Sequence, residues 1–439
     1  MSDTVLKDKK DQVPVLSSED AIFDDIRPCR DDEAPQELAK IAQDESLVTG
    51  IVRLRYPKLC KWLGPVLRLF VRRYIHKQLA HIHTIQDFQL QVAKAVESMV
   101  NETTDGLTFR GFDELDPNQS YLFISNHRDI SLDPAFIDFA LHLKTQRTLR
   151  IAIGNNLLKM PAATALMRLN KSFIVKRSVA SPRERLKEVI HLSQYMGLSL
   201  KEGHCIWIAQ REGRAKDGDD RTEEAVLKMI SMYGRSLKED FATYMSKLNI
   251  VPVSITYEFD PGDLDKAREL EAKARNNGVY HKGELEDIKS IVKGIKGYKG
   301  RVTIVAGKPI TSGFSTPEEL AQLIDDFIYQ HYELFPSVLI AAHELGLAPD
   351  EVMQDITEAE KQKFLERVHA YPAELQERVL KMYAFPYLNQ QAVQQGVKRH
   401  LDAKQADSGA ADTSAANTST ADTSSADPEV STAEDNAKA

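Results

Sequence analysis

Cysteine is scarce in this chain of 439 residues, which has only Cys29, Cys60 and Cys205. Their odd number and wide separation exclude a disulfide framework and the paired spacing of a zinc site, so we expect no metal centre. The same scarcity is typical of proteins that work in a reducing compartment.

Long uncharged apolar stretches are also missing. No run reaches the roughly 18 residues that a transmembrane helix needs. The opening MSDTVLKDKKDQ lacks the apolar core of a signal peptide. We therefore expect a cytoplasmic protein whose contact with a membrane is peripheral, on the inner face of the cell membrane.

Charge is ordinary in amount but uneven along the chain. Charged residues make up 28% and hydrophobic residues 42%, which excludes collagen-like, wholly disordered and disulfide-scaffold proteins. Of the net charge of -8, residues 1–50 carry -7 and residues 405–439 carry -6, which leaves +5 on the middle. A mildly basic body suits an anionic partner such as phosphate, nucleic acid or a phospholipid surface.

Composition and periodicity divide the chain into five regions. Residues 405–439 contain one sizeable apolar residue, Val430, so this tail cannot bury enough surface to offset its chain entropy. The regions are an acidic, partly disordered N-terminal segment (1–50), a basic amphipathic helical region (51–104), an α/β domain (105–312), a helical C-terminal region (313–404) and a disordered tail (405–439).

Residues 51–80 combine eight Lys and Arg side chains with no acidic residue. Apolar residues recur there at helical spacing, Trp62 lies beside them, and Gly64-Pro65 is expected to break or start a helix. Such a basic amphipathic helix suits an anionic bilayer surface. A helix packed on the core, with its basic residues in water, fits the pattern equally well.

From residue 105 on, short apolar segments alternate with helical patterns. This alternation predicts an α/β fold, with a central, mostly parallel sheet flanked by helices. The expected strands lie within 107–115, 120–125, 149–154, 172–176, 205–210, 249–258 and 300–310. One helix is expected to begin at 133, and others to cover 159–169, 181–201, 222–246, 262–293 and much of 316–401. The last region opens with a capping box at Thr316 and Glu319.

The first candidate for chemistry is His127, in a polar loop that directly follows an apolar strand. Histidine is the usual general base near neutral pH, and a nearby carboxylate can orient its ring. Asp133 and Asp129 are the two candidates for that carboxylate. Asp133 followed by Pro134 also fits an ordinary helix N-terminus, with no role in catalysis.

Three further segments end or form apolar strands. Lys176 and Arg177 follow the strand SFIV. Glu212, Gly213 and Arg214 lie in a turn after the strand CIWIA, where Arg could bind phosphate and Gly could let the backbone approach it. The strand around Pro252 is expected at an edge or a bulge of the sheet, because proline cannot donate to a ladder. Each segment alone also fits an ordinary strand end or surface turn.

In this order, the four segments resemble the blocks of the glycerolipid acyltransferase superfamily, which includes the lysophosphatidate and glycerol-3-phosphate acyltransferases. Asn126-His127 through Asp133 resembles its His/Asp block and Phe173 to Arg177 its aromatic–apolar–Arg block, while Glu212-Gly213 resembles its Glu-Gly block and Val251-Pro252-Val253 its closing Pro block. The similarity covers about 120–260. Five residues separate His127 from Asp133, one more than in the family, and Arg214 follows Gly213 directly, where the family has Thr-Arg or Gly-Arg.

The resemblance implies an acyltransferase of phospholipid biosynthesis that needs no cofactor. His127 would act as general base, oriented by Asp133, which the helix PAFIDFAL follows as in the family. Arg177, Glu212, Gly213 and Arg214 would bind the acceptor. The donor would be acyl-CoA or acyl-carrier protein, and the acceptor a phosphorylated glycerol or a lyso-lipid. An anionic membrane surface would be contacted through residues 51–80, and nucleic acid is not an expected partner.

A second class of function fits the same pattern. If the unusual His–Asp spacing marks an inactive site, the chain is a lipid-binding or adaptor protein that uses residues 51–80 at a membrane surface. The helical region after 316 would then contact its partner. An assay of acyl transfer from a thioester separates the two classes.

Overall fold

A computed structural model describes residues 16–400 of the protein, except 159, 178–180 and 284. The first 15 residues and the predicted tail 405–439 lie outside the described residues. The chain divides after Val397 into two units, and of the second unit only Lys398–His400 is described.

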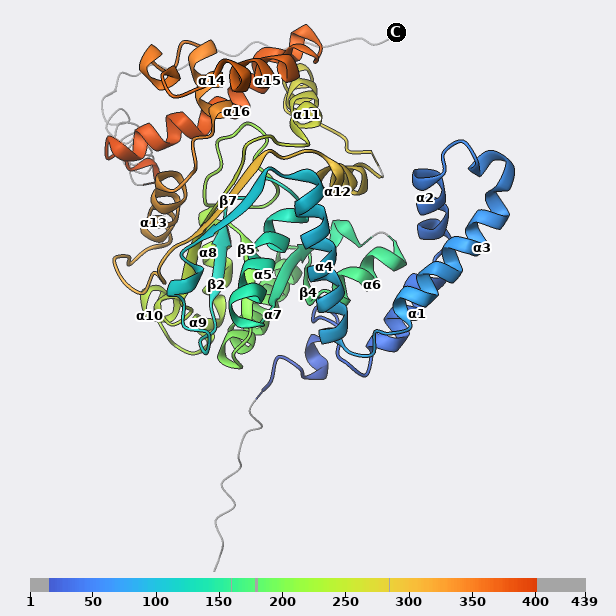
Figure 1. The fold of residues 1–439 in the computed structure, drawn as a ribbon. Coiled ribbons are helices and arrows are strands. Elements are labelled where there is room, and N and C mark those ends of the chain that lie inside the picture. The colour runs from blue at the N-terminus through green and yellow to red at the C-terminus, as the bar shows by residue number, and fades with distance from the viewer. Residues whose placement is uncertain (1–15, 159, 178–180, 284, 401–439) are drawn as a thin grey trace, which may run out of the picture. The chain divides into compact units, whose positions relative to one another are not determined.

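Within the described residues, seven strands form one sheet (Figure 1). Its order is β1-β7-β6-β2-β5-β3-β4, and every neighbouring pair is parallel except β6 and β7. The predicted α/β fold with a mostly parallel sheet is confirmed. The strands are β1 (Gly106–Arg110), β2 (Leu122–Ser125), β3 (Leu149–Gly154), β4 (Ser172–Val175), β5 (Cys205–Ala209), β6 (Ile250–Tyr257) and β7 (Arg301–Ala306).

Helices precede, connect and follow the strands. The α-helices are α1 (Ala34–Gln43), α2 (Glu45–Arg55), α3 (Cys60–Leu79), α4 (Ile85–Thr103), α5 (Leu132–Thr145), α6 (Pro161–Leu169), α7 (Pro182–Lys201), α8 (Glu224–Ile230), α9 (Met232–Ser236), α10 (Phe241–Ser246), α11 (Asp263–Arg275), α12 (Glu286–Lys296), α13 (Pro317–Gln330), α14 (Pro336–Glu344), α15 (Glu358–His369) and α16 (Ala373–Gln394). Short 3₁₀ turns are η1 (Ala21–Phe23), η2 (Phe112–Glu114), η3 (Asn155–Leu157) and η4 (Asp350–Met353).

Both faces of the sheet are covered, which explains why its strands are almost continuously apolar. Alternate residues of a strand point to opposite faces. Leu122 and Ile124 of β2 belong to a core shared with α7, α8, α10 and α13. Phe123 belongs to the opposite core, shared with α4 and α5. The C-terminal helices α14, α15 and α16 pack with α11 around a third core.

The basic region 51–80 contributes the end of α2 and all of α3. Val71 and Ile75 of α3 pack on Val48 and Val52 of α2. The predicted break at Gly64-Pro65 is a kink within α3, where Leu63 has non-helical backbone angles (φ -116°, ψ 19°). Across the part of the chain that the structure describes, no helix is both long and apolar enough to span a membrane.

The single long helix predicted over 222–246 is wrong. The segment forms α8, α9 and α10, with a turn between α9 and α10 in which Lys238 takes a left-handed conformation (φ 63°). Asp240 then caps α10, because its side chain accepts a hydrogen bond from the main-chain N–H of Thr243. The sequence signal for this restart was Asp240, a residue type that is common at helix N-termini. The capping box of Thr316 and Glu319 on α13 is confirmed.

Pro252 lies in an interior strand, so the edge alternative is wrong and the bulge alternative holds. β6 lies between β2 and β7, and the carbonyl of Pro252 accepts from Gly307 N at 2.9 Å. The next bridge pairs Ile250 with Ile310, which places one extra residue on the chain that follows β7. The missing N–H of proline therefore falls where the regular ladder to β7 has already ended.

Asp138 on α5 gives the fold a pH dependence. Its buried carboxyl group accepts from Leu149 N at 2.6 Å, and burial raises its pKa to about 7, opposed by that hydrogen bond and next by the charge of Lys171. Because the folded state holds this proton more tightly than the unfolded state, the contribution of Asp138 to stability falls as pH rises from about 4 to about 7.

We therefore expect Asp138→Asn, which keeps an acceptor for Leu149 N–H, to gain stability relative to the wild type as pH rises. The difference in unfolding free energy should grow by about 1.4 kcal/mol per pH unit between about pH 4 and 7, and then level off. Denaturant unfolding at a series of pH values measures it, with the exposed Asp355→Asn as control. A difference that does not change with pH contradicts the assignment.

Candidate active site

Four neighbouring parallel strands present polar residues at the same edge of the sheet. The strands β2, β5, β3 and β4 end there, followed by His127, Glu212, Asn155 and Arg177 respectively. The carboxyl edge of a parallel sheet is the usual place for a binding site in an α/β protein.

His127 is paired with Asp133. The ring Nδ1 of His127 lies 2.8 Å from Oδ2 of Asp133, whose side chain is fully buried (0% exposed). The same Oδ2 accepts the main-chain N–H groups of Arg128 (2.6 Å) and Asp129 (2.9 Å), and Oδ1 accepts the hydroxyl of Tyr257 (2.8 Å). Four hydrogen bonds thus fix the carboxylate at the start of α5, where the helix dipole also favours negative charge.

Asp129, the rival carboxylate, makes different contacts. Its Oδ1 accepts the main-chain N–H groups of Ser131 (3.0 Å) and Leu132 (2.9 Å), where α5 begins. It therefore supplies the capping bonds that the sequence allowed for Asp133. Burial, and next the charge of Asp133, raise the pKa of Asp129.

His127 lies at the wall of a cavity of about 620 Å³. This volume falls within the range of about 300–1,000 Å³ that is usual for ligand sites. Part of the lining is apolar, from Ile26, Ala152, Ile174, Val189, Leu192, Ile208, Val226 and Met229, and part is cationic, from Lys176, Arg177, Arg185, Arg211, Lys228 and Arg235. The cavity can therefore hold an apolar chain and an anionic group together.

Arg177, Glu212 and Gly213, which the sequence suggested as binding residues, line this cavity. Nε of Arg177 lies 3.5 Å from Oε1 of Glu212, and the main-chain N–H of Arg177 donates to Oδ1 of Asn155 at 3.2 Å. Gly213 adopts φ +77°, which glycine reaches without strain and which turns the chain after Glu212.

Arg214 is not among the residues that line the cavity. Its Nη1 instead donates to Oγ of Ser290 on α12 at 2.9 Å. Arg211 lies in the cavity wall, with Nε 3.8 Å from Oε1 of Glu223. Gly213 lies between these two arginines in the chain, and only Arg211 lines the cavity together with Arg177.

Two aromatic residues of the site, Trp207 and Tyr257, were not predicted from the sequence. The ring of Trp207 stands edge-on to that of His127, with centroids 5.7 Å apart, and its Nε1 donates to Oγ of Ser125 at 3.0 Å. Burial, and next the charge of Asp133, raise the pKa of Tyr257 well above its usual value, which keeps its hydroxyl proton available to Asp133. The sequence feature that could have indicated them is an aromatic side chain with a polar N–H or O–H group inside an otherwise apolar strand.

The residues that the structure describes contain no group of three or more His, Cys, Asp or Glu side chains placed to hold a metal ion.

Comparison with known proteins finds a family model that matches these residues. Residues 106–256, which contain all four motif segments, match the family model described as Acyltransferase. A search of curated proteins gave no match. Among solved structures, the 1-acyl-sn-glycerophosphate (LPA) acyltransferase of Thermotoga maritima is 17% identical, with a TM-score of 0.31 over 68% of this chain and 95% of that one. Residues 106–256 thus match an acyltransferase family model, which agrees with the acyltransferase resemblance expected from the four segments.

Proposed function

We propose that the protein transfers a fatty acyl group from acyl-CoA or acyl-carrier protein to a hydroxyl of a glycerol phosphate or a lyso-phospholipid, as a step of phospholipid biosynthesis. One observation carries this proposal. A histidine that is hydrogen-bonded to a buried carboxylate lies in the wall of a cavity with both apolar and cationic parts. The family-model match of residues 106–256 supports the same reaction class.

The geometry assigns a role to each atom of the His–Asp pair. Asp133 accepts Nδ1–H of His127, so Nε2 carries the lone pair that takes the proton from the acceptor hydroxyl. The hydroxyl oxygen attacks the thioester carbonyl and forms an ester bond, while the carbon–sulfur bond breaks. His127 then returns its proton to the leaving thiolate. General base catalysis of this kind contributes about 10²–10⁴-fold in rate.

The two kinds of cavity wall suit the two parts of a glycerolipid substrate. The apolar wall can bury an acyl chain, at about 0.8 kcal/mol per CH₂. Arg177 and Arg211 can bind a phosphate with forked, charge-assisted hydrogen bonds. Glu212, 3.5 Å from Arg177, can hold that guanidinium in place. We assign the phosphate to Arg177 and Arg211 rather than to Arg214, because Arg214 is hydrogen-bonded to Ser290 of α12.

The rival function, an inactive lipid-binding adaptor, needs no buried carboxylate on the imidazole. The four hydrogen bonds to Asp133 favour the enzyme, because burying an ionised group is costly unless its partners are retained. Release of free thiol from a long-chain acyl thioester, coupled to ester formation, is the discriminating assay.

The catalytic pair gives the first prediction on activity. We expect His127→Ala to lower kcat by at least about 100-fold, because the base is lost. Asp133→Asn should lower kcat by about 10⁴-fold, because the ring takes the wrong tautomer. Asp129→Asn is the matched control and should be far milder. If Asp129→Asn is the more damaging of the two changes, the orienting carboxylate has been assigned wrongly.

The proposed phosphate contacts give the second prediction on activity. Arg177→Ala and Arg211→Ala should each raise KM for a phosphorylated acceptor about 10- to 150-fold, which corresponds to losing a charge-assisted hydrogen bond of about 1.5–3 kcal/mol. Arg214→Ala serves as the control and should leave that KM close to the wild-type value. Unchanged KM in both test variants would mean that the acceptor phosphate binds elsewhere or that the acceptor carries none.

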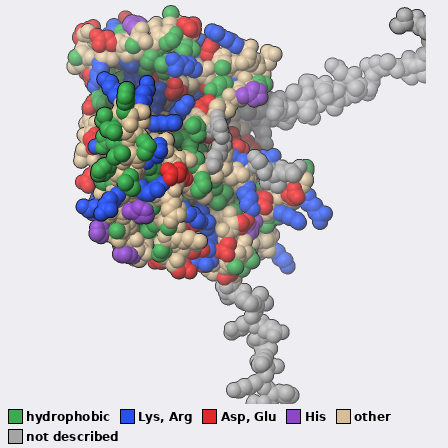
Figure 2. All heavy atoms as spheres, turned by 90° about the vertical axis from the view of Figure 1, so that its right-hand side faces the viewer, with side chains coloured by type: hydrophobic (Ala, Val, Ile, Leu, Met, Phe, Trp, Pro, Cys, Tyr) green, Lys and Arg blue, Asp and Glu red, His purple; other side chains and the backbone are tan. Residues whose placement is uncertain are grey.

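We further propose that α3 contacts an anionic membrane surface. One face of α3 packs on α2, while its other face exposes Trp62 (88%), Phe70 (67%), Leu69 and Tyr74. Figure 2 views the side of the molecule on which α3 lies in Figure 1, and shows hydrophobic side chains close to Lys and Arg side chains. Large apolar side chains exposed among cations suit insertion at a charged bilayer interface. The inner face of the cell membrane is the surface we propose.

The membrane proposal is tested with vesicles that contain phosphatidylglycerol. In a Trp207→Phe background Trp62 is the one remaining indole, since the chain has two. Its emission should shift to the blue with these vesicles, not with neutral ones, and the shift should shrink in 1 M salt. Reversing Lys61, Arg68 and Arg73 to Glu, which spares the ion pair of Arg72 with Glu45, should weaken partitioning more than about 100-fold, at about 1 kcal/mol per cation.

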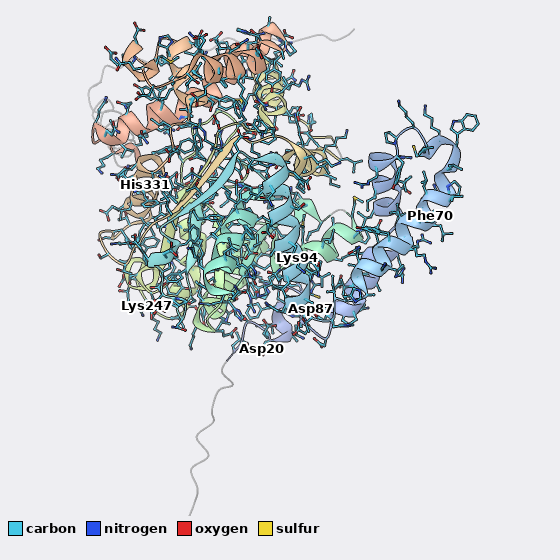
Figure 3. All side chains as sticks on the ribbon, viewed as in Figure 1. Asp20, Phe70, Asp87, Lys94, Lys247 and His331 are labelled. Atoms are coloured by element: carbon cyan, nitrogen blue, oxygen red, sulfur yellow. The ribbon has the colours of Figure 1, made fainter. Side chains whose placement is uncertain are left out.

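The matched control reverses Lys94, Lys247 and Lys381, which lie on other helices or at their ends; the first two are labelled with Phe70 in Figure 3. It should bind like the wild type. Equal loss of binding in both triple variants would show a general effect of net charge and contradict a specific contact by α3.

A further inference from the structure

The loop from Gln210 to Glu223, which carries Glu212 and Gly213, is closed at its base. The N–H of Glu223 donates to the carbonyl of Gln210 at 2.9 Å, and the N–H of Gln210 donates to the carbonyl of Ser125 at 2.9 Å. The loop thus starts and ends at one point beside the end of β2, in the manner of an Ω-loop.

Helices from later parts of the chain hold the outer side of this loop. Thr222 donates through its hydroxyl to Asp325 of α13 at 2.6 Å. Lys216 pairs with Glu269 of α11, and both side chains are largely buried. Gly218 lies against the carbonyl of Met382 on α16, so closely that a Cβ atom would lie 2.3 Å from that oxygen. The loop is therefore fixed relative to the rest of the domain.

The inner side of the same loop holds the main chain of His127. Oδ2 of Asp220 accepts the N–H of His127 at 2.7 Å, and the N–H of Ala215 donates to the carbonyl of His127 at 3.2 Å. Both main-chain polar groups of the proposed base are thus bonded to this loop. Asp133 fixes the ring, and the loop fixes the backbone from which the ring extends.

Asp220 is a costly residue at this position unless it has a role. Asp220 is 2% exposed, and burial raises the pKa of its carboxyl group to about 6, opposed chiefly by the charge of Arg128. It is not among the residues that line the cavity, so it does not meet a substrate bound there. A carboxylate accepts a hydrogen bond from a main-chain N–H more strongly than a neutral group does. The charge of Asp220 therefore strengthens its hydrogen bond with the N–H of His127.

We propose that Asp220 is a positioning residue for acyl transfer, which sets the distance of the His127 ring from the reacting atoms by holding the main-chain N–H of His127. This inference rests on the function proposed above. Misplacing a reacting group by about 1 Å costs about 100-fold in rate. Loss of Asp220 should therefore lower kcat, while substrate binding, which uses other residues, stays the same.

The test compares Asp220→Ala and Asp220→Asn with Asp217→Asn, an exposed change in the same loop. Steady-state kinetics are measured with full-length protein at 20 °C, well below the melting temperature of each variant. We expect kcat to fall about 100-fold in Asp220→Ala and by a smaller factor in Asp220→Asn, which keeps an acceptor oxygen. KM should stay within twofold in both, and Asp217→Asn should match the wild type.

A spectroscopic reading separates positioning from a general loss of structure. In a Trp62→Phe background, Trp207 is the remaining indole and stands edge-on to the His127 ring. Its emission should change in Asp220→Ala and, to a lesser degree, in Asp220→Asn, and should not change in Asp217→Asn. If Asp220→Ala does not fold, Asp220→Asn decides the question with the same readings.

Wild-type kcat in Asp220→Asn and Asp220→Ala overturns the inference. So does a rise in KM alone, or a lower melting temperature with unchanged kcat and Trp207 emission, since these indicate binding or purely structural roles. The proposed function itself fails differently, because the wild-type protein would then release no thiol in the presence of acceptor.

Discussion

The site depends on one buried interaction, the hydrogen bond from His127 Nδ1 to Asp133. A carboxylate with no exposed surface is costly to bury, and it is tolerated here because four donors converge on it. Three of these donors come from the loop that follows β2 and the fourth, Tyr257, from the end of β6. The pairing of β2 with β6 therefore brings together the parts of the site.

The parallel sheet also explains why the cavity has mixed walls. Strands β2, β5, β3 and β4 end side by side, so their polar loops meet at one edge while their apolar residues face α7 and α8 below it. A segment outside the matched domain completes the cavity, because Ile26 lines it and its carbonyl accepts from Ile174 N at 2.9 Å. A substrate with an apolar chain and a charged head fits both walls.

Local chemistry could be predicted from the sequence wherever it depends on neighbours along the chain. The strand ends that place His127, Arg177 and Glu212, and the capping box at Thr316, follow from periodicity and turn residues. The choice between Asp133 and Asp129 did not, because both lie within reach of His127 along the loop and only its folded path decides. The sequence also could not show that Arg214 lies outside the cavity wall, because its partner Ser290 on α12 is far away along the chain.

Contacts between segments that are far apart in the chain could not be predicted from the sequence, for a different reason. Tyr257 contacts the His127 loop because of the order of the strands, and Asp220 contacts it because the loop 210–223 closes on itself. Neither feature produces a periodic pattern in the sequence. The break of 222–246 into three helices shows the same limit at shorter range, since a cap at Asp240 outweighed a continuous apolar pattern.

The central claim is direct transfer from a thioester to a hydroxyl by a base that His127 provides. The most direct measurement follows a single turnover of purified protein with a labelled long-chain acyl thioester, with and without a phosphorylated glycerol or lyso-lipid acceptor. We predict one thiol released for each ester formed, dependence of both on the acceptor, and no acyl group on the protein by intact mass. Thiol release without acceptor, a stable acyl-protein, or no release with any acceptor would contradict the account.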